Sequence, residues 1–344
     1  MNRPAFLLLS LLSCARQAVP GAPAAQLNDV VFDRYTPLSS NEEIARRTLT
    51  PLTFAHGQRA LAARGEALGG QPVDLARERF AVYVPAGAPP AAGYGLLVFV
   101  SPGPEAPQPR RWRAPLDRHG LIFVAAAHSG NDASILERRL PLAVLAWENI
   151  RARYPLDPKR VYVGGLSGGS RVAEIAALAY PDVFRGALLN AGSEPIGGER
   201  GIYPPAADLF QRFRRTRLVY VTGEDDPGNL EDDQISQASM KEWCVFNLEV
   251  QVARRRGHEA LDAPALNDAL DALDRSRAVD ESELSRCTAR VERELAARLA
   301  DAEAALQRGD REGARERLSA IDRRYGGLAA PASVELDTRL TAQR

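Results

Sequence analysis

The chain has 344 residues, of which 45% are hydrophobic and 26% are charged, a composition typical of a globular protein that buries a core without extra cross-links. Lys and Arg together number 44, as do Asp and Glu, so the formal net charge is zero. A neutral chain has no electrostatic reason to bind nucleic acid or an anionic membrane surface. The composition therefore excludes a strongly basic, nucleic-acid-binding class, and we expect no nucleic acid as a partner.

The N-terminus predicts an export signal, which we assign to residues 1–25. Arg3 precedes the apolar run 6–12, and small residues follow up to Ala15, as in a secretory signal peptide. The run is too short for a transmembrane helix. The segment ending in Cys14 also resembles a bacterial lipobox, whose lipidated cysteine tethers a protein to a membrane; the rival interpretation is ordinary signal cleavage further on. We expect a periplasmic, membrane-anchored or secreted protein.

Residues 26–277 alternate short apolar runs with helical segments and predict one large domain. Short strands that are apolar on both faces and separated by helices indicate a mainly parallel sheet covered on both sides. The loops at the carboxyl ends of such strands build the active site. We expect strands at 79–84, 95–100, 121–127, 160–163, 184–189, 217–221 and 247–253, and helices at 41–47, 136–154 and 171–180.

Residues 278–344 differ in character from the rest of the chain. The segment 281–308 is charged, rich in alanine and helical in period, Gly309 and Asp310 interrupt it, and 313–324 resumes a helix. These signals predict a C-terminal helical hairpin that is packed on, or tethered to, the main domain. The tail contains no candidate chemistry.

The segment 160–169 predicts the nucleophile of a hydrolase. It contains G-x-S-x-G at Gly165, Ser167 and Gly169, between a β-branched strand and a helix. A strand, sharp turn and helix is the context that a nucleophile elbow requires. Glycines fit because a strained backbone at the nucleophile leaves no room for neighbouring side chains. We therefore expect Ser167 to be a nucleophile at a helix N-terminus, rather than part of a plain βα turn.

A serine nucleophile requires a base and an acid that orients the base. In this arrangement the chain order is Ser, then Asp or Glu, then His. The only histidine after Ser167 is His258, directly after the last expected strand. The acid should follow the strand 217–221, where Asp225 and Asp226 both occur. We favour Asp226, three residues after a glycine, and keep Asp225 as the alternative.

The oxyanion donors are predicted less specifically. One should be the backbone N–H of Gly168, the residue after the nucleophile. The second should come from the loop after residue 100, where Ser101, Gly103 or Glu105 has an N–H to give, and we choose Gly103. Three further residues could line the cleft, although ordinary structural roles are favoured for each: Trp112, His128 and Asn131.

The three cysteines suggest a disulfide but no metal site. Cys14 belongs to the expected signal, which leaves Cys244 and Cys287. In an exported chain these two can form a disulfide that clips the tail to the main domain, and two separate buried thiols are the equally weighted alternative. No cluster of cysteine and histidine has ligand spacing. We expect neither metal nor cofactor.

The sequence resembles the polyhydroxybutyrate depolymerase-like and feruloyl-esterase-like branch of the α/β-hydrolases. The resemblance rests on Asp157 to Gly169, on Tyr180 to Gly186, on the loop from Gly223 to Asp226, and on Gly257-His258. It covers about residues 79–275. The resemblance implies the α/β-hydrolase fold and the triad Ser167, Asp226 and His258. The chain departs from the family in the loop after residue 100, which lacks the usual His-Gly stretch, so the substrate class is open.

The predicted function is an exported serine hydrolase that cleaves carboxylic esters through an acyl-enzyme. Two alternatives remain: a peptidase of the prolyl-oligopeptidase type, and a catalytically inactive, lipid-anchored binding protein on a hydrolase scaffold. The segment between residues 192 and 216 is short, which predicts a small lid and an open cleft suited to a bulky or polymeric substrate. The sequence does not indicate the oligomeric state.

Overall fold

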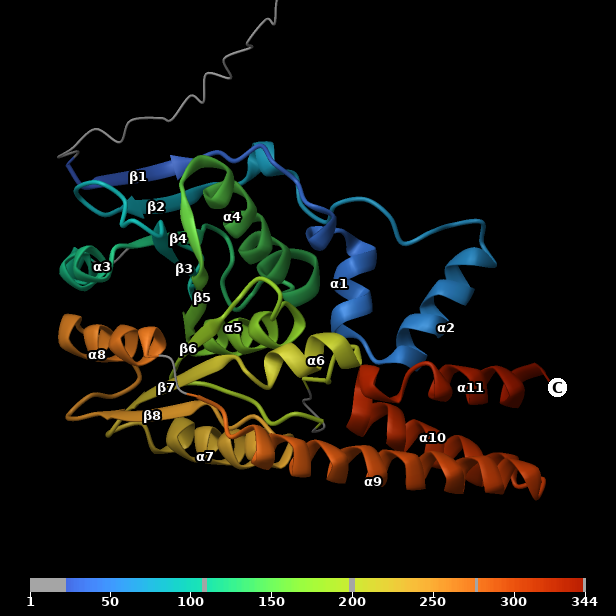
Figure 1. The fold of residues 1–344 in the computed structure, drawn as a ribbon. Helices are drawn as coiled ribbons and strands as arrows, with labels where there is room; N and C mark the ends of the chain where they lie inside the picture. The colour runs from blue at the N-terminus through green and yellow to red at the C-terminus, as the bar shows by residue number, and fades with distance from the viewer. Residues whose placement is uncertain (1–22, 107–109, 198–201, 276–277, 343–344) are drawn as a thin grey trace, which may run out of the picture.

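The fold is taken from a computed structural model that describes residues 23–106, 110–197, 202–275 and 278–342. Figure 1 shows a central twisted sheet with helices packed against it and a helical extension at one side. Residues 1–22 of the expected signal, Cys14 among them, lie outside the described residues, whereas Ala25, the last residue of that expected segment, is the first residue of a strand. None of the described helices combines the length and the apolar character needed to cross a membrane.

The described part of the chain forms an eight-stranded sheet in the order β1-β2-β4-β3-β5-β6-β7-β8. The β1–β2 and β2–β4 pairs are antiparallel, and every pair from β4 onward is parallel. The strands are β1 Ala25–Val30, β2 Phe80–Val84, β3 Tyr94–Val100, β4 Leu121–Ala126, β5 Leu156–Leu166, β6 Gly186–Asn190, β7 Arg217–Gly223 and β8 Leu248–Ala253. Parallel pairing brings the carboxyl ends of β3 to β8 to one edge, where the predicted site residues follow.

Helices cover both faces of the sheet because alternate strand residues point to opposite sides. Leu96 and Val98 of β3 join the buried cluster that includes α4 and α5, whereas Leu97 and Phe99 join the cluster on the α3 and α8 side. The helices are α1 Asn41–Thr48, α2 Pro51–Ala62, α3 Arg113–His119, α4 Leu140–Arg153, α5 Gly168–Ala179, α6 Ala207–Phe213, α7 Pro227–Glu242, α8 Ala263–Asp274, α9 Glu281–Gln307, α10 Arg311–Tyr325 and α11 Ala332–Ala342. This confirms the predicted class of a mainly parallel sheet with helices on both faces.

Some element boundaries differ from the prediction. β5 is longer than expected at both ends, and α5 begins at Gly168, directly after the nucleophile candidate. The first turn of the expected helix 136–154 is a π-helix over Ile135–Arg139. The sequence analysis missed β1 and five helices of the main domain, namely α2, α3, α6, α7 and α8. Ser40 caps α1 by accepting from the Glu43 N–H at 3.3 Å, which satisfies one of the free amides at the helix N-terminus.

The C-terminal tail consists of α9, α10 and α11, and Figure 1 shows it beside α2, away from β1. The expected hairpin is present, and α11 is an addition to the prediction. Asp337 of α11 is bonded by His56 Nε2 of α2 at 2.9 Å, and Arg59 of the same helix reaches the same carboxylate. Asp322 of α10 accepts from the Leu52 N–H at 3.1 Å. The tail therefore docks on α2 through carboxylates in addition to apolar packing.

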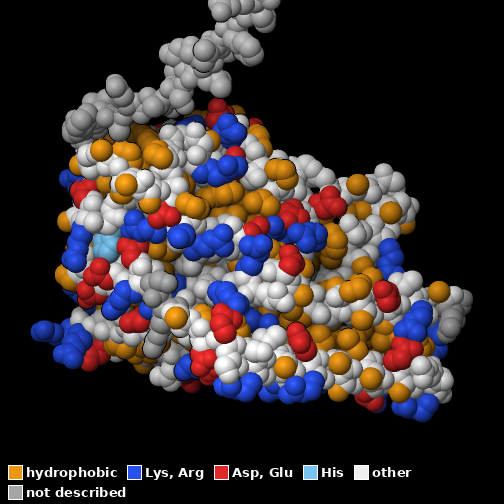
Figure 2. All heavy atoms as spheres, in the orientation of Figure 1, with side chains coloured by type: hydrophobic (Ala, Val, Ile, Leu, Met, Phe, Trp, Pro, Cys, Tyr) orange, Lys and Arg blue, Asp and Glu red, His pale blue; other side chains and the backbone are white. Residues whose placement is uncertain are grey.

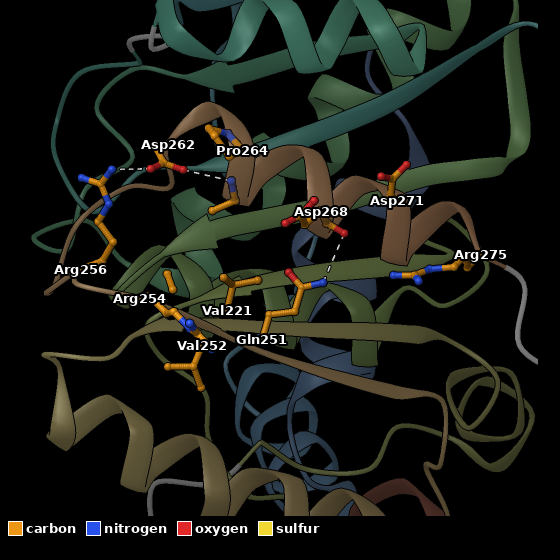
Figure 3. Close-up of a pocket in the computed structure, with 12 residues that line it drawn as sticks. Val221, Gln251, Val252, Arg254, Arg256, Asp262, Pro264, Asp268, Asp271 and Arg275 are labelled. Carbon is orange, nitrogen blue, oxygen red and sulfur yellow. Dashed lines mark hydrogen bonds and ion pairs between the residues drawn. The ribbon is translucent and has the colours of Figure 1, made fainter.

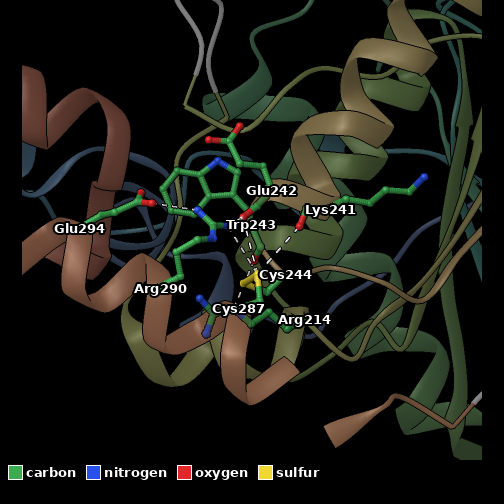
Figure 4. Close-up of a disulfide and its surroundings, with 8 residues drawn as sticks. All are labelled: Arg214, Lys241, Glu242, Trp243, Cys244, Cys287, Arg290 and Glu294. Carbon is green, nitrogen blue, oxygen red and sulfur yellow. Dashed lines mark hydrogen bonds and ion pairs between the residues drawn. A yellow bond between two sulfur atoms is a disulfide. The ribbon is translucent and has the colours of Figure 1, made fainter. Parts of the chain in front are cut away.

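Cys244 and Cys287 form a disulfide that links the end of α7 to α9 (Figure 4). Cys244 is fully buried, and the neighbouring Trp243 packs edge-on against Tyr325 of α10, with ring centroids 5.6 Å apart. The disulfide interpretation of these cysteines is confirmed. The cross-link encloses β8 and α8, and it fixes the tail to the sheet domain at one point.

The surface is mixed in charge. On the face shown in Figure 2, basic and acidic side chains alternate over the sheet domain and the tail alike. This agrees with the equal numbers of acidic and basic residues in the sequence. An ion pair between two exposed groups contributes about 0–1 kcal/mol, whereas several pairs have one buried partner, such as Arg47 with Glu43 and Arg138 with Glu78.

Candidate active site

Ser167 lies on a sharp turn between β5 and α5. Its backbone has φ 57° and ψ −125°, a region that a residue with a β-carbon occupies only under strain imposed by its surroundings. Its N–H donates to Asn190 O at 2.8 Å, and its carbonyl accepts from the Ser170 N–H at 2.9 Å. The end of β6 and the first turn of α5 therefore hold the turn from both sides.

The glycines of the motif are required by close backbone contacts. A β-carbon on Gly165 would lie 2.2 Å from Gly169 O, and one on Gly169 would lie 2.1 Å from Val100 O. A β-carbon on Gly168 would lie 2.2 Å from Oδ1 of Asn131. Because real contacts of this kind are longer than 3 Å and the clashes at Gly165 and Gly169 are with backbone atoms, only glycine fits at these two positions, whereas a side chain at 168 would require Asn131 to move. The sequence therefore folds into a turn that presents the serine at the edge of the sheet.

The loops after β7 and β8 are bonded to each other, which places Asp226 near His258. The Asp225 N–H donates to Arg256 O at 2.8 Å, and the Arg255 N–H donates to the Glu224 carboxylate at 2.9 Å. These contacts hold the two loops at the same edge of the sheet.

Asp226 and His258 form a hydrogen-bonded pair. His258 Nδ1 lies 2.7 Å from Asp226 Oδ2, and Asn229 Nδ2 lies 3.0 Å from both carboxylate oxygens. Burial raises the pKa of Asp226, but hydrogen bonds from Asn229 and His258 outweigh it and hold this pKa below its ordinary value. The carboxylate is therefore charged at neutral pH and accepts the Nδ1 proton, which leaves Nε2 as the basic nitrogen.

The structure brings the three predicted residues to one edge of the sheet but does not bond the serine to the histidine. Asn190 connects the strands between them, since its Nδ2 donates to Val221 O of β7 at 3.1 Å. Among the described residues, no hydrogen bond joins Ser167 Oγ to His258. The His258 side chain is 45% exposed, whereas that of Asp226 is 11% exposed. The imidazole is thus on the open side of the site, and the carboxylate is beneath it.

The two predicted oxyanion donors differ in their present contacts. The N–H of Gly168 lies in the first turn of α5, where amides have no partner within the helix. The N–H of Gly103 donates to Ser101 Oγ at 3.1 Å, so this amide must change partner before it can bind an oxyanion. Asn131 packs against Gly168, and its N–H donates to Pro102 O at 2.9 Å. The role of Gly103 stays a prediction.

The other cleft candidates have separate positions. Trp112 is buried in the core, 1% exposed, and donates from Nε1 to Leu261 O at 2.7 Å. His128 lies with Pro104 and Glu105 around a hollow at the β1–β2 side of the site. The sequence analysis missed Arg139, which is buried and donates to Ser129 O at 2.9 Å and to Ser101 O at 3.2 Å. Arg139 therefore braces the two loops that follow β3 and β4.

A buried acidic network lies between α5 and α7, and the sequence analysis missed it as well. Glu174 of α5 accepts from the Glu194 N–H at 2.7 Å and from Ser236 Oγ at 3.1 Å. Burial raises the pKa of Glu174 to about 8. Asp233 of α7 accepts from Ser193 Oγ at 2.6 Å. A glutamate among the apolar residues of an amphipathic helix was the available signal that this side chain is buried.

A larger hollow of about 650 Å³ lies between β8 and α8 (Figure 3). Charged side chains surround it, including the ion pair of Arg256 with Asp262. Ser167, Asp226 and His258 are not among its lining residues. In the described part of the chain, no three His, Cys, Asp or Glu side chains are grouped so as to hold a metal ion.

The strand order with its two antiparallel pairs, the strained serine after β5 and the acid and histidine after β7 and β8 define the class of α/β-hydrolases. No family model matches the chain. Over 66 residues the chain is 49% identical to a poly(3-hydroxyalkanoate) depolymerase C from Paucimonas lemoignei. The aligned segment covers 19% of this chain and 14% of that protein.

A poly(3-hydroxybutyrate) depolymerase from Ralstonia pickettii is 30% identical over 98 residues, 24% of this chain and 20% of that protein. The chain therefore spans at most a fifth of either curated relative. An S-formylglutathione hydrolase from Staphylococcus aureus has 13% identity and a TM-score of 0.43 over 57% of this chain and 92% of that one. Within the α/β-hydrolases, the expected resemblance to the depolymerase-like and esterase-like branch is confirmed.

Proposed function

We propose that the chain is an exported serine hydrolase that cleaves carboxylic esters through an acyl-enzyme intermediate. One observation carries the proposal: a strained Ser167 at the start of α5 shares the edge of the sheet with the bonded Asp226–His258 pair. This is the set of groups that acyl transfer requires, namely a nucleophile, a base and an acid that orients the base.

In the proposed reaction, Nε2 of His258 removes the hydroxyl proton of Ser167 as Oγ attacks the ester carbonyl. Asp226 keeps the proton on Nδ1 and stabilises the imidazolium that forms. The N–H of Gly168, with that of Gly103 after its change of partner, donates to the developing oxyanion. The imidazolium then protonates the leaving alcohol. Water attacks the acyl-enzyme with His258 again as base, which releases the acid and restores the serine.

Because His258 and Ser167 are not bonded in the structure, the proposal includes a small movement of the exposed His258 loop when substrate binds. Catalytic hydrogen bonds are often long in unliganded enzymes and shorten only with substrate in place. Asp226 is held firmly, so the movement involves the imidazole rather than the acid.

For the substrate, we propose a bulky or polymeric ester of hydroxy acids. The names of the two depolymerase relatives support this class, and so does the short segment after β6, which contains only α6 as regular helix among its described residues. We further propose that residues 1–25 are an export signal with Cys14 as a possible lipid attachment point, that 26–277 form the hydrolase domain, and that 278–344 form a helical tail.

A panel of p-nitrophenyl esters of graded acyl length tests the function, with wild type and Ser167→Ala compared under the same conditions. Wild type should hydrolyse the panel, and the variant should lose activity by roughly 10⁴-fold or more. Dipeptidyl anilides measured in parallel should be poor substrates. Anilide cleavage faster than ester cleavage would indicate a peptidase. A wild-type chain that is folded but inactive on both substrate types would indicate a binding protein on a hydrolase scaffold.

A further inference from the structure

We propose that Asn229 is a positioning residue that holds Asp226 against His258 and connects the pair through Arg171 to the helix that begins at Ser167. This inference rests on the proposed function for its catalytic meaning, although the contacts exist independently of it. Asn229 lies in the first turn of α7, three residues after Asp226. No role follows for it from the nucleophile motif or from the triad pattern.

Asn229 fixes the rotation of the Asp226 carboxylate. Its Nδ2 lies 3.0 Å from Oδ1 and 3.0 Å from Oδ2, and it also lies 3.1 Å from His258 Nδ1. Since Nδ1 carries the proton that points to Asp226, both nitrogens are donors, and both converge on the same carboxylate. Asn229 therefore shares the carboxylate with the histidine and keeps Oδ2 turned toward the imidazole.

The other end of the Asn229 amide faces a cation. Arg171 Nη2 lies 3.5 Å from Asn229 Oδ1, which is a long contact whose attraction is mainly electrostatic. The guanidinium is itself fixed, because Glu194 accepts from Nε at 2.8 Å and Asp232 accepts from Nη2 at 2.9 Å. With the amide oxygen toward the cation and the amide nitrogen toward Asp226, one orientation of Asn229 satisfies both neighbours.

Arg171 joins this contact to the nucleophile helix. Its backbone N–H donates to Ser167 O at 3.2 Å, one turn after the start of α5. The contacts thus run from Ser167 through Arg171 and Asn229 to Asp226. They give α5 and α7, which carry the nucleophile and the acid, one shared polar connection near the reacting atoms.

The positioning matters because the base is exposed. The His258 side chain is 45% exposed, so few packing contacts oppose its rotation, and Asp226 is the group that selects its tautomer and direction. Without the Asn229 side-chain amide, the carboxylate keeps the backbone hydrogen bond from residue 229 and loses the side-chain donor that bridges its two oxygens, so it turns away from the imidazole more easily. The carboxylate then stabilises the imidazolium that forms during acyl transfer less strongly, and the tautomer of His258 with the proton on Nδ1 is no longer strongly favoured.

The test compares Asn229→Ala with wild type, with Asn267→Ala as the matched control. Asn267 donates from Nδ2 to Asp271 at 3.2 Å, so the control removes a similar amide–carboxylate bond on α8. We expect kcat/KM of Asn229→Ala on p-nitrophenyl acetate to fall roughly 10- to 100-fold, mostly in kcat, because the lost bond is to a charged group. The acid limb of its pH profile should move to lower pH.

A second measurement does not depend on activity. With only four histidines in the chain, ¹⁵N-histidine NMR can follow the His258 tautomer directly. Wild type and Asn267→Ala should show Nδ1 protonated, and Asn229→Ala should show a mixture. Arg171→Gln should move both readouts in the same direction by less. Unchanged tautomers, with kcat/KM of Asn229→Ala within about twofold of wild type, would overturn the positioning role.

The two proposals fail in different ways. If wild type neither hydrolyses esters nor reacts with a fluorophosphonate, but the tautomer still depends on Asn229, the proposed function is wrong and the positioning of His258 stands. If wild type is active and the tautomer does not respond to Asn229→Ala, the function stands and the positioning role is wrong.

Discussion

Removing the disulfide should destabilise the protein strongly, and the size of the effect follows from the chain. Cys244 and Cys287 are separated by 43 residues. Cross-linking a loop of this length lowers the entropy of the unfolded chain and so raises its free energy at 25 °C. A term that does not depend on loop length contributes about 0.6 kcal/mol, and the term that grows with loop length contributes about 3.4 kcal/mol. We therefore expect Cys244→Ser with Cys287→Ser to lower the free energy of unfolding by about 4 kcal/mol.

Urea denaturation followed by circular dichroism measures this loss, with the wild type examined with and without a reducing agent. Reduced wild type should unfold at nearly the same urea concentration as the double variant, because both lose the same constraint. The reducing agent should leave the double variant unchanged. A loss of less than about 1 kcal/mol would refute the reasoning, since it would mean that the unfolded chain is not restrained by this cross-link.

Two further predictions concern buried groups near the site. The pKa of Glu174 is raised from 4.5 to about 8, so between these pH values the folded chain keeps a proton that the unfolded chain releases, and stability falls as pH rises. Glu174→Gln removes that loss and should be more stable than wild type by on the order of 4 kcal/mol at pH 8 and by less than about 1 kcal/mol at pH 5; equal urea midpoint differences at both pH values would contradict this. Gly165→Ala should destabilise by about 3 kcal/mol, since its β-carbon would meet Gly169 O at 2.2 Å. Gly228→Ala is the matched control, because nothing lies within 4 Å of its β-carbon, and its melting temperature should not fall.

The sequence was most informative where local pattern and chemistry coincide. The apolar strand before Ser167, the glycines around it and the helix after it are local features, and together they predict the turn that the structure shows. The parallel sheet follows from short strands that are apolar on both faces. His258 was identifiable because it is the sole histidine after the serine, and the structure pairs it with Asp226.

The missed features depend on contacts between distant segments. β1 is a polar edge strand with mostly exposed residues, so it has no apolar alternation to reveal it. The position of Glu174 among apolar helix residues indicates burial, but its partners come from the loop after β6 and from α7, and only the folded chain shows them. Asn229 is an ordinary polar residue in the sequence, and only the folded chain places its amide between a carboxylate and a guanidinium. α11 packs against α2, which lies at the other end of the chain, so no local pattern shows where its apolar residues are buried.

The central claim is that Ser167 is a nucleophile activated by His258, and labelling with a fluorophosphonate followed by peptide mass spectrometry tests it most directly. The account predicts one phosphonylated peptide, modified at Ser167, in the wild-type protein, and labelling slowed by orders of magnitude in His258→Ala. A folded wild-type protein with no adduct at Ser167, or one labelled equally fast without His258, would contradict it.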